Sequence, residues 1–231
     1  MAPASRGLNR FYLLLGVIAI AGAALLYYLV RRPAAVSIPA NVAVLAADTA
    51  GFRGYVLGSE SAPVEITEYA DFECPACGDF ASVQFPDVRE RLIATGRVRW
   101  RFRDFPLSQH RNARVAAHAA ACANDQGKYW EMHDAIFAGQ GQWSLERNAA
   151  PTYRRYAGTL GLDQAAFDEC MQSARYAGRI QASVEEGVRL GVGSTPTFLI
   201  DGRLYPGVMP SDSIRAIVDR LSAPAGTAPV Q

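Results

Sequence analysis

The sequence predicts an α/β domain with a helical insertion, preceded by one transmembrane helix. Three observations lead to this prediction. Segments with strand patterns occur within residues 52–71, 97–103 and 197–205. Residues 112–190 lie between the last two of these segments and have helical periodicity without a strand pattern. Residues 11–30 carry no charge over a length that suffices to cross a membrane.

The composition is that of a globular chain with balanced charge. Half of the 231 residues are apolar, which is enough for one sizeable core. The formal net charge of +1 gives no reason to expect a nucleic-acid partner. The four cysteines fit two disulfides in an oxidising compartment or, in the cytosol, one redox pair and two buried thiols.

Residues 11–30 are predicted to form a transmembrane signal-anchor. A helix of this length spans about 30 Å, the thickness of one hydrocarbon core. Tyrosines lie near both ends, as in the aromatic belts of membrane helices, but arginines flank both sides, so charge alone does not determine the orientation. Because few residues precede the run and a large domain follows it, we expect residues 1–10 in the cytoplasm and the domain on the periplasmic or other extracytoplasmic side. A cleaved signal peptide is the competing interpretation, and the length of the apolar run counts against it.

The other boundaries follow from composition. Residues 31–51 are rich in Ala, Pro and Val without periodicity, which predicts a linker. Residues 52–221 form the predicted domain, with the helical insertion at about residues 109–190. Residues 222–231 are rich in Pro, Ala, Gly and Thr and predict a flexible tail.

The first part of the domain predicts two strands and then a helix. Residues 52–58 and 64–71 have the apolar pattern of strands. Pro75 suits the first turn of a helix, where no N–H is needed, and Gly96 suits its C-terminal end. Pro86 lies inside this helix and is expected to kink or break it.

Residues 97–103 alternate strictly between arginine and apolar side chains, which predicts a strand with one polar face. The arginine face has two interpretations. It could be an anion-binding strip, or it could be a solvated face whose aliphatic stems cover apolar surface. The second interpretation is favoured.

The rest of the domain is predicted to be helical, followed by a hairpin and a last helix. Asp163 is a candidate N-cap within the helical block. Residues 197–200 predict a strand, and Asp201-Gly202 predicts a two-residue hairpin turn. Ser211 is expected to cap the last helix, whose apolar residues have helical spacing.

Two cysteines separated by two residues carry the predicted chemistry. Cys74 follows the strand of residues 64–71 and precedes the helix that begins at Pro75. At a helix N-terminus, unpaired backbone N–H groups and the helix dipole stabilise a thiolate and lower the thiol pKa. Cys77 lies one turn further along, close enough to form a disulfide with Cys74. The pair therefore predicts a redox centre.

Several motifs together resemble the DsbA-like branch of the thioredoxin superfamily, and they are spread over about residues 57–221. They are Asp71-Phe72-Glu73-Cys74-Pro75-Ala76-Cys77, Phe105-Pro106-Leu107, residues 122–134 and residues 191–198. The resemblance implies a thioredoxin-like fold with an inserted helical subdomain. It also implies a metal-free active site in which the Cys74–Cys77 disulfide is the only redox group.

The resemblance implies roles for individual residues. Cys74 is expected to be the attacking cysteine and Cys77 the buried resolving one. Glu68 matches an acid that assists proton transfer to the buried thiol, and the alternative is a strand carboxylate with a structural hydrogen bond.

Four further residues are expected to contact substrate: Pro75, Ala76, Thr195 and Pro196. Pro196 matches the family's cis-proline, which leaves the edge beside Thr195 free to pair with a substrate strand. An ordinary turn proline is the alternative.

The other cysteines, Cys122 and Cys170, resemble a second, structural disulfide of some DsbA-like proteins, and two buried thiols are the alternative. No metal site is expected. The three histidines, His110, His118 and His133, are interpreted as lone residues without ligand spacing.

The resemblance implies a thiol:disulfide oxidoreductase that oxidises cysteines of reduced, exported proteins. Reoxidation would require a DsbB-like or quinone-linked membrane oxidase, and residues 11–30 would keep the two in one membrane. The Pro-Ala dipeptide between the cysteines, where the best-known relatives have Pro-His, and Thr195 leave the direction of electron flow open. The alternatives are a reductase or isomerase fed by a membrane reductant, and a non-enzymatic tethered chaperone or copper-handling module.

Overall fold

The computed structural model describes residues 5–30 and 36–223, and the chain divides into two compact units, Met1–Ala35 and Val36–Gln231. Residues 1–4 of the predicted N-terminal segment, residues 31–35 of the predicted linker and residues 224–231 of the predicted tail lie outside the described residues.

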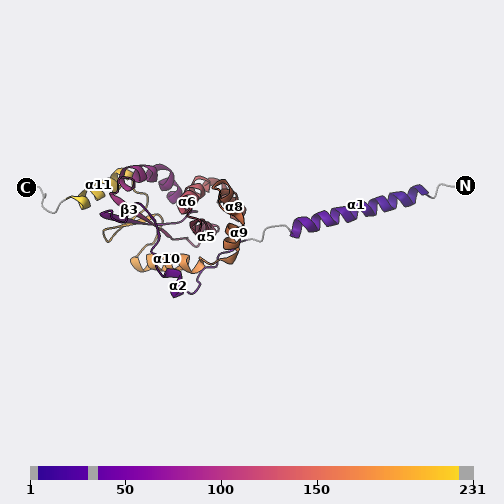
Figure 1. Ribbon diagram of the computed structural model, residues 1–231, viewed down its shortest axis with the longest axis horizontal. Coiled ribbons are helices and arrows are strands. Elements are labelled where there is room, and N and C mark those ends of the chain that lie inside the picture. The colour runs from indigo at the N-terminus through magenta and orange to yellow at the C-terminus, as the bar shows by residue number, and fades with distance from the viewer. Residues whose placement is uncertain (1–4, 31–35, 224–231) are drawn as a thin grey trace, which may run out of the picture. The chain divides into compact units, whose positions relative to one another are not determined.

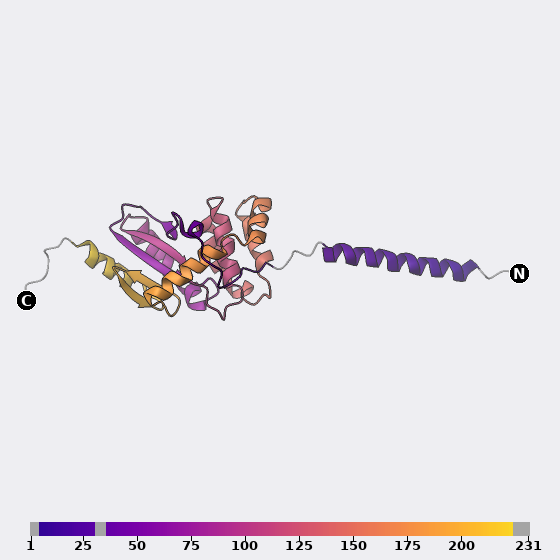
Figure 2. The same cartoon turned by 90° about the horizontal axis from the view of Figure 1, so that it is seen from below.

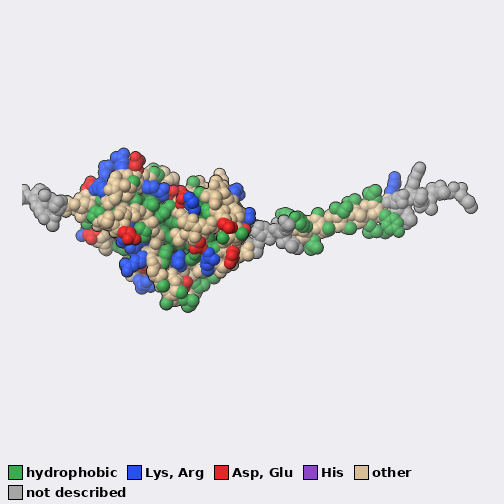
Figure 3. All heavy atoms as spheres, viewed as in Figure 1, with side chains coloured by type: hydrophobic (Ala, Val, Ile, Leu, Met, Phe, Trp, Pro, Cys, Tyr) green, Lys and Arg blue, Asp and Glu red, His purple; other side chains and the backbone are tan. Residues whose placement is uncertain are grey.

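The first unit contains one long apolar helix, α1 (Ser5–Val30). Residues Arg10–Tyr28 are long and apolar enough to cross a membrane. Large apolar side chains along this stretch are exposed, as Figure 3 shows, and no other element in the described part of the chain meets the same test. The apolar helix predicted from residues 11–30 is therefore present, with a length that suits a single membrane anchor.

The second unit is built on a five-stranded mixed sheet. Its strands are β1 (Tyr55–Leu57), β2 (Val64–Ala70), β3 (Val98–Asp104), β4 (Thr197–Ile200) and β5 (Arg203–Pro206). They lie in the order β1-β3-β2-β4-β5, with β2 and β3 parallel and the other pairs antiparallel. The parallel pair needs a crossover, and the helix after β2 provides it.

A long helix follows β2 and carries the Cys74–Cys77 motif at its start. It consists of α3 (Pro75–Asp79), η1 (Phe80–Gln84), α4 (Phe85–Val88) and η2 (Arg89–Ile93), and η1 and η2 are π-helical. Of the two expected effects of Pro86, a kink or a break, the break does not occur, because the helix continues through α4 to Ile93. The turns on either side of α4 widen, so that the Phe85 N–H reaches the Phe80 carbonyl and the helix accommodates the proline.

Helices cover both faces of the sheet (Figures 1 and 2). The long helix and α11 (Ser211–Ser222) pack on one face around Phe80, Trp100 and Phe198. On the other face, α10 (Ala177–Leu190) lies over Tyr69 and Phe105. Gly187 permits this approach, because a Cβ there would lie 2.6 Å from a Phe105 ring carbon.

The helical insertion lies between β3 and β4, as predicted. Its elements are α5 (Ala113–Asn124), α6 (Tyr129–Ala138), α7 (Gln140–Trp143), α8 (Ala150–Thr159), α9 (Gln164–Ser173) and α10. The alanines of α5 are almost entirely buried, which lets α6, α8, α9 and α10 pack closely around this helix. The Asp163 side chain caps α9 by accepting hydrogen bonds from Ala165 N and Ala166 N, as predicted.

The compact unit begins earlier than the predicted boundary at residue 52. Ile38 is buried in the core of the helical insertion, and Asn41 donates its N–H to Gln181 Oε1. A short helix, α2 (Ala46–Thr49), packs against α10 (Figure 1). Of the predicted linker, residues 36–51 are thus part of the folded unit, because they pack against long-range partners that composition does not reveal.

Two side-chain predictions also need correction. The arginines of β3 are paired instead of solvated: Arg99 and Arg101 contact Glu65, and the buried Arg103 contacts Glu186. Ser211 does not cap α11, since its side chain makes no cap hydrogen bond and its backbone N–H donates to Gln84 Oε1.

Candidate active site

Cys74 and Cys77 lie at the junction between β2 and the long helix. Cys74 is the N-cap residue with extended backbone angles, and Pro75 is the first helical residue, a position that suits its missing N–H. Both cysteines are free thiols. Cys74 retains a small exposed fraction of 8%, whereas Cys77 is fully buried. An incoming group therefore reaches Cys74 and not Cys77.

The segment before Cys74 is held by a buried carboxylate. Asp71 accepts hydrogen bonds from Glu73 N at 2.7 Å and from Leu107 N at 2.8 Å. The Asp71 carboxylate also lies 2.7 Å from His110 Nδ1. Asp71 thus connects the cysteine loop to the loop that follows β3.

A glutamine of the helical insertion holds the same loop from the other side. Gln140 Nε2 donates to the carbonyl oxygens of Phe72 and Cys74, at 2.7 and 2.9 Å. The Gln140 side chain lies so close to Gly78 that a Cβ at this glycine would fall 2.9 Å from the Gln140 Cδ atom. The insertion therefore contributes directly to the geometry of the redox site.

The two thiols differ sharply in acidity. The pKa of Cys74 is lowered to about 5, mainly because the Cys77 thiol donates a hydrogen bond to its thiolate. The Thr195 side chain and the backbone N–H groups of Cys77 and Ala76 lower it further. Burial raises the pKa of Cys77 well above the usual value, and the hydrogen bond to Cys74 adds to this effect.

The loop before β4 lies against Cys74. The Thr195–Pro196 peptide bond is cis, as the resemblance implied. The neutral Cys74 thiol donates to the Thr195 carbonyl at 3.4 Å. The Thr195 hydroxyl has no other partner within the described residues, which leaves it free to stabilise the Cys74 thiolate.

Glu68 lies in the middle of β2, between Phe102 of β3 and Phe198 of β4. It is buried and accepts a hydrogen bond from Trp100 Nε1 at 3.1 Å. Burial raises its pKa to about 8, and its negative charge contributes to the raised pKa of Cys77. Glu68 is therefore electrostatically coupled to the buried thiol.

The sequence-predicted residues Cys74, Cys77, Thr195 and Pro196 thus converge, and Pro75 and Ala76 form the turn between the cysteines. Sequence reasoning missed the roles of Asp71 and Gln140. The position of Asp71, directly after β2 and shortly before Cys74, was a sequence signal that its carboxylate could hold the cysteine loop. Gln140 had no signal, since its contacts span 66 and 68 residues along the chain.

The structure corrects one interpretation of the histidines. His118 lies beside Cys122 and Cys170, and the ligand atoms of these three residues are within 4.8 Å of one another. His118 and Cys122 are four residues apart on α5, a spacing that places them on one helix face. Cys122 and Cys170 form a disulfide that joins α5 to α9.

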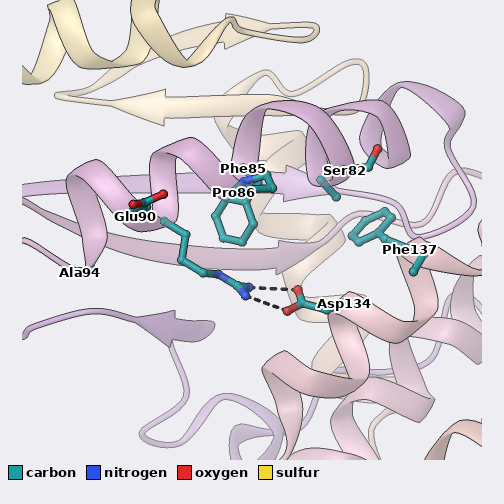
Figure 4. A pocket seen from close by; sticks show the side chains of 10 residues that line it. Ser82, Phe85, Pro86, Glu90, Ala94, Asp134 and Phe137 are labelled. Carbon is teal, nitrogen blue, oxygen red and sulfur yellow. Dashed lines mark hydrogen bonds and ion pairs between the residues drawn. The ribbon is translucent and has the colours of Figure 1, made fainter.

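A pocket of about 390 Å³ lies beside the long helix that begins at Pro75. Figure 4 shows Phe85 and Pro86 of this helix facing Asp134 and Phe137 of α6. The Asp134 carboxylate forms a bidentate ion pair with Arg89, in which the two guanidinium nitrogens lie 2.7 and 3.0 Å from the two carboxylate oxygens. None of the predicted site residues lines the pocket.

The sheet, the helical insertion, the Cys74–Cys77 pair and the cis-proline loop define a DsbA-like protein of the thioredoxin superfamily. Residues 52–220 match the family model described as Thioredoxin, and the chain belongs to this family.

Solved structures agree with this class. Wolbachia pipientis α-DsbA1 has a TM-score of 0.66 at 26% identity, covering 73% of this chain and 90% of that chain. A thioredoxin-like oxidoreductase from Silicibacter pomeroyi has a TM-score of 0.62 at 26% identity. The match covers 76% of this chain and 96% of that chain. Chlamydia trachomatis DsbA shares the fold, with a TM-score of 0.67 at 20% identity. The match covers 79% of this chain and 97% of that chain.

Curated relatives carry another name. A protein of Salinispora tropica named Na(+)/H(+) antiporter NhaA 3 is 37% identical over 214 residues, or 87% of this chain. A Salinispora arenicola protein named Na(+)/H(+) antiporter NhaA 1 is 40% identical over 176 residues. The chain spans 31% and 25% of the length of these relatives, so their names describe much longer proteins.

The raised pKa of Glu68 predicts a pH-dependent penalty on stability. A carboxyl whose folded-state pKa is raised stabilises the fold when protonated, and this contribution is lost as the pH rises from about 4.5 to about 8. Each tenfold change in proton affinity corresponds to about 1.4 kcal/mol, so the loss approaches 4–5 kcal/mol. We expect Glu68→Gln to remove this loss, as measured by chemical unfolding between pH 4 and 9.

The exposed Glu60→Gln provides the matched control and should unfold with the pH dependence of the unsubstituted protein. Parallel pH profiles for the unsubstituted protein and Glu68→Gln would contradict a raised pKa at Glu68.

Proposed function

We propose that the domain is a thiol:disulfide oxidoreductase that oxidises cysteines of exported proteins through a Cys74–Cys77 disulfide. The observation that carries the proposal is the pairing of a partly exposed thiol of pKa about 5 with a fully buried thiol of raised pKa. This pairing gives one good leaving group and one protected resolving thiol.

The reaction begins with the oxidised pair. A substrate thiolate attacks Cys74 Sγ, a substrate–Cys74 disulfide forms, and the Cys74–Cys77 bond breaks. The electron pair passes to Cys77, which takes up a proton because burial disfavours its charge. A second substrate thiolate then attacks the substrate sulfur of the mixed disulfide. Cys74 leaves as a thiolate, so the substrate has lost two electrons and the enzyme has gained them.

Glu68 is suited to supply the proton that Cys77 takes up. Its pKa of about 8 keeps it protonated at neutral pH, and its charged form, once the proton has left, would raise the pKa of Cys77. The Trp100 N–H orients the carboxyl group at 3.1 Å. In this role Glu68 acts on the buried thiol and not on the substrate.

The low pKa of Cys74 favours oxidation of the substrate. Relative to the ordinary value of 9.0, a pKa of about 5 stabilises the reduced enzyme about hundredfold at pH 7. For a two-electron couple this corresponds to about 60 mV towards a more oxidising potential. Ala76 stands between the cysteines where the best-known relatives have histidine. The acidity of Cys74 therefore rests on Cys77, Thr195 and the backbone N–H groups.

The site has an edge that suits an extended polypeptide. The Thr195 carbonyl faces Cys74, and Pro196 has no N–H to occupy the adjoining position. A substrate strand can therefore pair beside Thr195 while its cysteine reaches Cys74. Pro75 and Ala76 would form the opposite wall of this contact.

The proposed location is the outer side of the cytoplasmic membrane. The support is α1, which is apolar over Arg10–Tyr28, together with the Cys122–Cys170 disulfide, which favours an oxidising compartment. Reoxidation of the reduced pair requires an electron acceptor in the same membrane. A DsbB-like or quinone-linked oxidase has the chemistry for this step.

Replacing the resolving thiol tests the chemistry. We expect Cys77→Ser to accumulate adducts in which Cys74 has attacked a disulfide of an exported protein, because the Cys77 thiol that could attack Cys74 and reverse this step is absent. These adducts should appear on non-reducing gels and disappear on reduction. Cys74→Ser should form none, and Cys77→Ser without adducts would contradict the oxidoreductase function.

The redox state of the pair in its own cell tests the direction. An oxidase should be isolated with Cys74 and Cys77 mainly as a disulfide, as measured by alkylation of acid-quenched cells. The Cys74→Ala and Cys77→Ala double variant provides the baseline for the remaining cysteines. A mainly dithiol state would favour a reductase or isomerase and would contradict the proposed direction.

A further inference from the structure

Three side chains outside the active site converge around the second disulfide. His118 and Cys122 lie on α5, and Cys170 lies on α9. Their ligand atoms lie within 4.8 Å of one another, and all three residues are at most 1% exposed. The redox reaction proposed for Cys74 and Cys77 uses none of them.

The tautomer of His118 is determined by its contacts. His118 Nε2 lies 2.9 Å from the Cys170 carbonyl oxygen, which can only accept a hydrogen bond, so Nε2 carries the proton. Nδ1 is therefore left with its lone pair. The ring is completely buried and forms no ion pair in the described part of the chain, an environment that disfavours a charged ring.

The Nδ1 lone pair is buried and has no partner within the described residues. The neighbouring disulfide cannot provide one, because its sulfurs carry no hydrogen. A buried acceptor without a partner costs about 1–3 kcal/mol. A histidine retained only for packing would carry this cost without compensation.

The same arrangement is typical of a metal ligand. A histidine that binds a metal usually donates its other ring N–H to a backbone carbonyl or carboxylate, which fixes the ring and the tautomer. His118 has this bond to Cys170, and its free nitrogen lies beside two sulfurs. We propose that His118, Cys122 and Cys170 bind one Cu(I) ion when the Cys122–Cys170 disulfide is reduced.

The choice of Cu(I) follows from the number and type of ligands. Two thiolates select soft ions, and complete burial keeps bulk water from serving as a fourth ligand. Structural zinc sites are almost always four-coordinate and tetrahedral, so three ligands disfavour zinc. Three-coordinate binding by two sulfurs and one nitrogen suits monovalent copper.

A dithiol can serve as the reductant that opens the Cys122–Cys170 disulfide. The dithiol transfers two electrons and two protons to the Cys122–Cys170 bond and becomes a disulfide itself. Cu(I) then replaces the two thiol protons, which are released. With metal–sulfur bonds of about 2.3 Å, the two sulfurs separate to about 4 Å. The Cα atoms of the two cysteines, 5.7 Å apart, leave room for this separation by side-chain rotation.

The test uses the full chain with Cys74→Ala and Cys77→Ala, which removes the other thiols. The protein is reduced in denaturant and refolded in detergent without oxygen, and alkylation verifies two free thiols. Cu(I) is then titrated in competition with a coloured Cu(I) chelator. We expect one Cu(I) per chain, and none for the same protein with its disulfide intact.

Substitution of His118 tests the nitrogen ligand. His118→Ala should weaken Cu(I) binding at least about tenfold, and Cys122→Ala with Cys170→Ala should abolish it. X-ray absorption of the copper-loaded protein should show two sulfur neighbours and one nitrogen neighbour, a measurement that needs no substitution at the site. Absence of Cu(I) from the reduced protein, or coordination by sulfur alone, would overturn the proposal.

Discussion

The hydrogen bond from the Cys77 thiol to the Cys74 thiolate is the interaction on which the proposed chemistry depends. It is the largest cause of the low pKa of Cys74, and it joins the N-cap residue of α3 to a residue of the first turn. The helix backbone and Thr195 contribute in the same direction. Burial has the opposite effect on Cys77, so one turn of helix separates a stable thiolate from a stable thiol.

The surrounding fold holds that turn in place from two sides. Asp71 fixes the segment before Cys74 to the loop after β3, and Gln140 reaches the same segment from the helical insertion. The insertion is therefore part of the active site and not only a cover beside it. This explains how a long block without strands, inserted between β3 and β4, can be integral to the redox site. A substitution that shortens Gln140 would remove its hydrogen bond to the Cys74 carbonyl oxygen.

Local patterns predicted the strands, the order of elements and the cysteine pair, because each depends on neighbours in sequence. Predictions failed where distant partners decide the outcome. Pro86 does not end its helix because the turns around it widen, and residues 36–51 fold because Ile38 and Asn41 find partners in the insertion. The arginines of β3 alternate as a solvated face would, yet glutamates of β2 and α10 pair with them.

His118 was interpreted as a lone residue, although Cys122 lies beside it four residues further along the same helix. Cys170, the third member of this cluster, comes from another helix.

The acidity of Cys74 is the central claim, and thiolate absorbance near 240 nm measures it directly. With the active pair reduced and the Cys122–Cys170 disulfide intact, a pH titration should show one thiolate forming with a midpoint near pH 5. The midpoint should move upwards in Cys77→Ala, which lacks the main hydrogen-bond donor. A midpoint near the ordinary value of 9.0, or one that Cys77→Ala leaves unchanged, would contradict the account.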